Sequence, residues 1–236
     1  MQAITVNVGN TRVTPLNTLD GVYTQILSIA IPLKSSPDIL LRFHSVISTI
    51  VLLQDPLPIP SLASLLATGT DDIISMLIHL RSIIFLTGLE DTPRIYHKSF
   101  PDFITDTKHC SHDSRFHISI GIQHAHIAQN CFRVMDEQLW ENICDLKYPE
   151  RYFDNDKIQH LLGGRISWEL YYACLHWATH LFNAEEDDDL CELLERFSFT
   201  HLLHWLEVLS LIGRLDVGRI ALDYARRFAV GRFTRT

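Results

Sequence analysis

The sequence predicts a mainly α-helical protein: a winged-helix domain with a small β-hairpin, followed by an α-helical, solenoid-like domain. Apolar residues recur at helical spacing over most of the 236 residues. Between residues 61 and 96, a short helix, a tight turn, a second helix and two short strands follow one another, as in a winged helix. After this unit, helix pairs succeed each other at similar spacing, which is typical of an α-solenoid.

Three segments follow from this division. We expect residues 1–17, which are polar and β-branched without a helical period, to be a poorly ordered start. Residues 18–108 form the expected winged-helix domain, and residues 109–236 the helical linker or superhelical domain.

The winged-helix domain begins with two predicted helices. The first covers residues 19–31 and ends at Pro32. The second follows Pro37 and has Asp38 as its cap, and a stiff proline-rich linker covers residues 55–60. The apolar stripe of the first helix, which we expect to face the core, consists of Leu19, Val22, Ile26 and Ile29.

The winged-helix unit itself is predicted from local signals. A short helix covers residues 61–67, a turn follows at 68–69, and a second helix covers residues 70–82. Strands are expected at residues 83–86 and 94–96. A protein of this kind could read DNA with the second helix, but that helix begins with two aspartates and has one arginine, whereas DNA binding needs several phosphate contacts.

The junction between the hairpin and the next helix contains the main candidate residue, His97. Ser99 is a suitable N-cap, and Asp102 three residues later can complete a capping box. Phe100 and Phe103 then share one helix face, turned inward. His97 precedes this cap and can face a cleft, as a phosphate-sensing histidine or simply as a hydrogen-bonded histidine at a helix start.

The second half is predicted to be wholly helical from Ile120 onward. A short helix covers residues 190–197 after an acidic solvated run at 185–189, and the helix over 201–212 is apolar nearly all round, so we expect it to be buried on several sides. The other stripes are Ile127, Cys131, Val134, Met135 and Leu139; Ile166, Leu170, Ala173, Cys174, Trp177 and Leu181; and Ile220, Tyr224 and Phe228.

Composition limits the partners and the compartment. A net charge of −8 predicts no general attraction to nucleic acid or to an anionic membrane. Five cysteines without a CxxC motif read as reduced thiols of a cytoplasmic protein. The most apolar segment, residues 39–53, is shorter than the roughly 20 residues that span a bilayer, and we see no signal peptide.

Other chemistry has weaker support. The spacing of the histidine-rich stretch does not match paired zinc ligands, and the sequence shows neither a GxSxG nucleophile motif nor a phosphate loop. The basic residues near the C-terminus are expected to be a solvent-facing surface rather than a binding patch. The histidine-rich stretch contains His109, Cys110, His112, His117, His124 and His126, and the basic residues are Arg214, Arg219, Arg226, Arg227, Arg232 and Arg235.

Several short stretches together resemble the region just after the ATPase core of fungal NLR-like STAND proteins of the NACHT class. The resemblance runs from about Leu16 to Phe228. The matching stretches are residues 19–27, 50–57, 97–106, 115–116, 142–146, 172–181 and 201–210, with His124 and Cys131.

This resemblance implies a regulatory role without catalysis. His97 matches the histidine of the pattern His-x-Ser-Phe-x-(Asp/Glu)-Phe, which contacts the β-phosphate of bound ADP in such proteins. It implies a latch that closes on ADP and opens on exchange for ATP, with the nucleotide held by an upstream NACHT ATPase core. The chain shows neither that core's phosphate loop nor its magnesium-binding carboxylates, so no cofactor and no enzyme activity are expected of it. The alternative is a stand-alone helical adaptor that binds a protein partner through residues 120–228.

Overall fold

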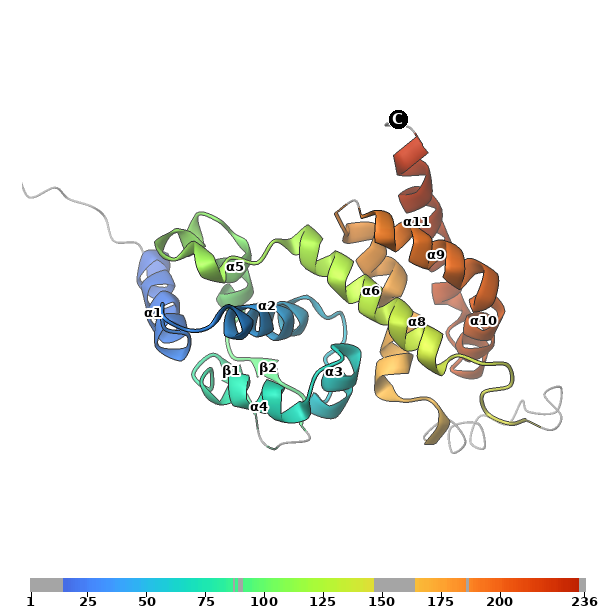
Figure 1. Cartoon of the computed structure of the whole chain (residues 1–236), viewed down its shortest axis with the longest axis horizontal. Coiled ribbons are helices and arrows are strands. Elements are labelled where there is room, and N and C mark those ends of the chain that lie inside the picture. Colours follow the sequence, from blue (N-terminus) through green and yellow to red (C-terminus); the bar gives the residue numbers. More distant parts are fainter. Residues whose placement is uncertain (1–14, 87, 89–90, 147–163, 186, 234–236) are drawn as a thin grey trace, which may run out of the picture.

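Two groups of helices lie next to each other along the long axis of the molecule (Figure 1). The computed structural model describes residues 15–86, 88, 91–146, 164–185 and 187–233. The N-terminal group contains α1 (Pro15–Ala30), α2 (Pro37–Leu52), α3 (Ile59–Leu65), α4 (Thr70–Ile78), β1 (Ile84–Phe85), β2 (Arg94–Ile95), α5 (Ser99–Thr105) and 3₁₀ turns at His109–His112 and Ser114–Phe116. The C-terminal group contains α6 (Ile120–Gln138), α8 (Trp168–Asn183), α9 (Asp188–Thr200), α10 (Leu202–Leu211) and α11 (Leu215–Phe233).

The fold is mainly helical with a small two-stranded antiparallel sheet, as the sequence predicts. Ile84 pairs with Ile95 and Phe85 with Arg94. The Tyr96 N–H donates to the Ile83 carbonyl at 2.9 Å and extends the pairing by one bond. The predicted hairpin is therefore present, with strands shorter than expected.

The helix starts of the N-terminal group differ from the predicted ones. Helix α2 has Ser36 at the N-cap, and Asp38 lies in the first turn. Helix α3 begins at Ile59, inside the predicted extended linker, because proline is tolerated in the first turn of a helix. Helix α4 has Gly69 rather than Thr70 at the N-cap, and it ends at Ile78, four residues before the predicted end.

The inward face of α1 is not the predicted one. Leu27 and Ile31 are fully buried, and Tyr23 is nearly so. Of the predicted stripe, only Ile26 packs partly against the core, and the others are exposed, with Ile29 at 72%. Helix α1 therefore has two apolar faces, and the more aromatic one packs on α5.

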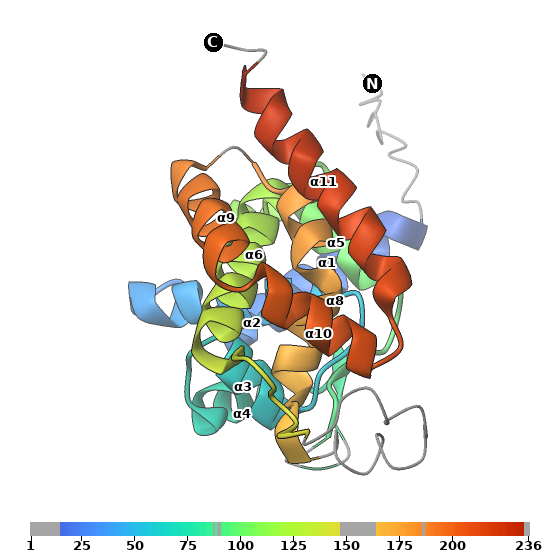
Figure 2. The ribbon, with the colours of Figure 1, turned by 90° about the vertical axis from the view of Figure 1, so that its right-hand side faces the viewer.

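Helices α6 and α8 form the centre of the C-terminal group, with α9 against α6 and α11 against α8 (Figure 2). Four large rings, Phe132, Trp177, Phe197 and Trp205, pack with centroids 4.9–5.9 Å apart. Trp205 Nε1 also donates to the Cys174 carbonyl at 2.8 Å. The predicted stripes of α6 and α8 are buried, except for the half-buried Ile166, which precedes α8.

The last two helices are less buried than predicted. In α10, Leu203 is 76% exposed, and only Trp205, Val208 and Leu209 are buried. In α11, Ile220 is exposed and the small residues Ala221 and Ala225 face inward. A Cβ on Gly218 would lie 3.2 Å from Leu209, so the small side chains of α11 allow α10 to approach closely.

Several expectations fall on residues that are not described. Residues 1–14 and 147–163 lie outside the described part, and with them most of the segment predicted to be a poorly ordered start. Helix α1 starts at Pro15, inside the segment predicted to be poorly ordered. Of the described helices, none alone is long and apolar enough to cross a membrane, and only the pair α3 and α4, bent by 116°, meets that test of length and composition together.

Candidate functional site

His97 lies between β2 and α5, with its side chain exposed. Its Nδ1 accepts the Ser99 backbone N–H at 3.2 Å and lies 2.7 Å from Ser99 Oγ. Its carbonyl accepts the Phe100 N–H at 3.1 Å. His97 therefore caps α5, the role that the sequence assigned to Ser99.

The predicted capping box is not formed. Lys98 occupies the N-cap position with helical backbone angles and no side-chain cap bond. Ser99 Oγ instead lies 2.9 Å from the Tyr23 hydroxyl of α1. The Tyr23 ring packs on Phe100 at 5.4 Å and on Phe103 at 5.3 Å, so the inward turn of both aromatics is confirmed.

The hydrogen bonds of Nδ1 determine what His97 can offer outward. Because Nδ1 accepts a backbone N–H, the neutral ring carries its proton on Nε2. Among the described residues, none hydrogen-bonds to that Nε2–H. The ring thus presents one oriented donor toward the outside.

An acidic cleft of about 420 Å³ adjoins this junction. Its lining includes Asp20, Ser99, Asp102 and Asp106. Asp20 Oδ2 lies 2.7 Å from His109 Nδ1, and this hydrogen bond raises the pKa of His109. The carboxylates disfavour an anion inside the cleft, which leaves the Nε2 edge of the His97 ring outside this acidic lining.

The histidine and cysteine stretch does not gather into a metal centre. His117 Nε2 lies 3.2 Å from the Thr105 carbonyl, and His126 is exposed. Cys110 is buried, and burial raises the pKa of its thiol to about 11. Within the described ranges no three potential ligands come together.

A buried polar chain that the sequence did not predict joins the two helix groups. The Gln54 N–H donates to the Tyr172 hydroxyl at 3.1 Å, and that hydroxyl lies 2.7 Å from His180 Nε2. His180 Nδ1 lies 2.8 Å from His124 Nδ1. The sequence did not predict this pair, because periodicity does not show that α6 and α8 bring His124 and His180 together.

The donor and acceptor roles in this series of hydrogen bonds follow from its first donor, the Gln54 N–H. If Tyr172 accepts from Gln54 and donates to His180 Nε2, then His180 Nδ1–H donates to His124 Nδ1, and every polar atom of the contacts is used. The reverse direction would leave the buried Tyr172 proton without a partner. Burial lowers the pKa of His124, and that of His180 to about 3, so both rings are neutral.

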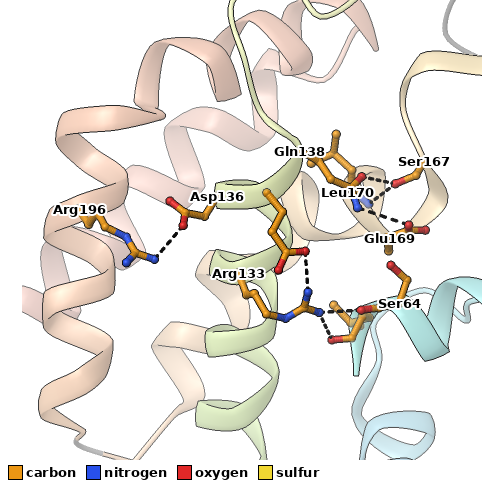
Figure 3. A network of polar contacts seen from close by, with 10 residues as sticks. Ser64, Arg133, Asp136, Gln138, Ser167, Glu169, Leu170 and Arg196 are labelled. Carbon is orange, nitrogen blue, oxygen red and sulfur yellow. Dashed lines mark hydrogen bonds and ion pairs between the residues drawn. The ribbon is translucent and has the colours of Figure 1, made fainter. Parts of the chain in front are cut away.

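A second anchor between the groups is Arg133 of α6 (Figure 3). Its Nη2 donates to the Ser64 carbonyl at 2.6 Å and to the Leu65 carbonyl at 3.0 Å, where α3 ends. Its Nη1 pairs with Glu137 at 2.8 Å. The guanidinium thus adds donors at the end of α3, where carbonyls run out of partners inside the helix, and the Ser64 carbonyl also accepts the Ala67 N–H at 3.2 Å.

The same region joins α6 to α8 and α9 (Figure 3). Ser167 caps α8 by accepting the Leu170 N–H at 3.1 Å, and it donates to Gln138 Oε1 at 2.7 Å. Arg196 of α9 pairs with Asp136 at 3.2 Å. These contacts support the architecture, and none presents a group for chemistry.

The remaining candidates are engaged locally. Arg42 pairs with Asp72 at 2.7 Å, so the start of the would-be recognition helix is acidic and already paired. Asp223 pairs with Arg226 at 2.9 Å and with Arg227 at 2.7 Å, which neutralises part of the basic C-terminal surface.

Comparisons with protein-family models, curated proteins and solved structures find no match for this chain.

Proposed function

We propose that this chain is the winged-helix and helical-linker part of an NLR-like NACHT signalling ATPase, in which His97 is an ADP-sensing latch. One observation carries the proposal: the exposed His97 ring is oriented through Nδ1 and has an outward Nε2–H. The order α3, α4, β1, β2 supports a winged helix, and the succession α6 to α11 supports a helical linker. The nucleotide would be held by an upstream core, and the chain itself would have no catalytic role.

In this latch, a hydrogen bond from His97 Nε2–H would hold the phosphate, and a positive charge on the ring is not needed. A neutral imidazole can donate Nε2–H to a phosphate oxygen while Nδ1 still accepts the Ser99 N–H. The bond to phosphate and the cap of α5 therefore use different ring nitrogens and can be present together. Release follows when the phosphate moves away.

Two substitutions separate the latch from the cap. His97→Asn retains an acceptor near the Nδ1 position and lacks the distal donor, whereas His97→Gln retains a distal N–H. In the protein that carries the upstream core, we expect H97N to speed release of a fluorescent ADP at least tenfold, since a hydrogen bond to a charged group is worth about 1.5–3 kcal/mol. H97Q should stay closer to the original rate.

Control measurements make this test decisive. His79 is exposed in the same unit, and H79N should leave the release rate unchanged. Calorimetry of the chain alone with ADP should show no binding. Tight binding that H97N does not alter, or a full transcript without an encoded phosphate loop, would contradict the latch.

A stand-alone helical adaptor is the second candidate. It is favoured by exposed apolar side chains at the α9–α10 corner, where Phe199 is 86% exposed. Cys131 and Cys174 are buried thiols without a disulfide, which supports a cytoplasmic setting for either function. A related whole protein that never carries an ATPase core would favour the adaptor.

A further inference from the structure

The outer face of α1 carries an apolar stripe with the spacing of a coiled-coil seam. Leu19, Val22, Ile26 and Ile29 follow one another at intervals of three, four and three residues, and Leu33 comes four residues later. Leu33 is 81% exposed, and Leu19, Val22 and Ile29 are exposed too, whereas Ile26 is half-buried because it also packs against the edge of the chain's own core. Helix α1 lies at the end of the molecule farthest from α9 to α11, where another chain can reach it (Figure 1).

The spacing and charge of α1 indicate what fits this stripe. A strict 3–4 spacing is the pattern of a seam that packs on another helix. The only charged residue between Pro15 and Ala30 is Asp20, which is buried and bound to His109. A partner helix must therefore be apolar and needs no charges beside its seam, and α1 itself has this character.

We propose that α1 pairs antiparallel with α1 of a second copy of this chain. In the register that places Leu19 opposite Ile29 of the second copy, Val22 lies opposite Ile26 of the second copy. All four layers then combine positions a and d, as antiparallel seams require, and a twofold axis relates the copies. The uncharged flanks bring no like charges together along the seam.

The contact is small, which sets the expected strength. A standard interface buries about 800 Å² on each partner. The seam from Leu19 to Ile29 covers only about one and a half heptads and supplies less, so the dimer is weak and concentration-dependent. Each copy carries a net charge of −8, so added salt should strengthen the pairing by screening the repulsion between copies. This proposal is independent of the nucleotide latch.

Sedimentation equilibrium of the chain tests the proposal. We expect the mass to rise with concentration from 27.2 kDa toward twice that value. Ile29→Lys and Leu19→Glu should each weaken the dimer at least tenfold. The double variant should recover most of the affinity, because the introduced glutamate of each copy faces the introduced lysine of the other. Leu203→Lys changes an equally exposed leucine on α10 and should have no effect.

Each outcome decides the matter. A chain that stays monomeric at 0.2 mM in 0.5 M salt overturns the proposal. So does a dimer that L203K disrupts and I29K does not, or one that the double variant fails to restore although circular dichroism shows all variants folded. Position 29 is mostly exposed, so I29K should fold, and Leu33→Lys provides a second variant outside the helix.

Discussion

The buried His124–His180 pair predicts that acid destabilises this protein by a defined amount. Burial lowers the pKa of His180 to about 3, whereas an unfolded histidine titrates near 6.5. Below pH 6.5 the unfolded chain therefore binds a proton that the native state does not, and stability falls as pH falls until about pH 3. From pH 7 to pH 5, His180 alone should cost about 2 kcal/mol of the free energy of unfolding.

His124 acts in the same direction, since burial lowers its pKa too. His109 acts in the opposite direction, because the hydrogen bond to Asp20 raises its pKa and favours the native state as pH falls. The change in the free energy of unfolding of the wild-type chain between pH 7 and pH 5 therefore contains contributions from several histidines. A difference between variants isolates the contribution of His180.

His180→Gln provides that difference. Glutamine can accept from Tyr172 and donate to His124, but it does not titrate. The variant should be less stable than the wild type at pH 7, and this gap should close by about 2 kcal/mol at pH 5. Urea unfolding at both pH values measures it, and His126→Gln, which changes an exposed histidine of α6, should unfold with the wild-type pH dependence. Equal losses of stability in H180Q and wild type between pH 7 and 5 would refute the reasoning.

Three further predictions concern the contacts that hold the helices together. Arg133→Ala removes the guanidinium donors of the Ser64 and Leu65 carbonyls, of which Ser64 keeps the Ala67 N–H, and should cost about 2 kcal/mol in urea unfolding, whereas Arg226→Ala on the exposed surface should cost less than about 0.5 kcal/mol. Tyr23→Phe removes the bond to the Ser99 hydroxyl and should cost about 1 kcal/mol by the same assay. Cys131 and Cys174 are buried, with thiol pKa values raised by burial, so a thiol reagent should modify them only as fast as the chain unfolds.

Local sequence patterns predicted the helices and strands well, but they predicted poorly which face of a helix is buried. Periodicity identified the helices over α6 and α8 because one face of each is consistently apolar. It selected the wrong face of α1, since Leu19, Val22, Ile26 and Ile29 form as regular a stripe as the inward residues do. Only the packing of Tyr23 against α5 decides between the two faces, and that contact spans 76 residues of sequence.

At the candidate site, too, local features were predicted and contacts between distant residues were not. The sequence placed His97 correctly at the junction between hairpin and helix, because turn and capping signals are local. It assigned the cap to Ser99, whereas the imidazole takes that role and Ser99 reaches Tyr23. His124 and His180 are 56 residues apart in the sequence, so their contact depends on how α6 and α8 pack. No local sequence motif predicts it.

The two proposals can be tested separately because they use different faces of α1. Tyr23 on the inward face holds Ser99, and Ser99 contacts the His97 ring. The proposed dimer uses the outward face, where Ile29 lies nearly two turns from Tyr23 along the helix. A lysine at position 29 should therefore leave the orientation of His97 intact, and H97N should leave the dimer intact. Loss of both properties in either single variant would show instead that α1 had shifted as a whole, and would contradict the rigid placement of this helix on which both proposals depend.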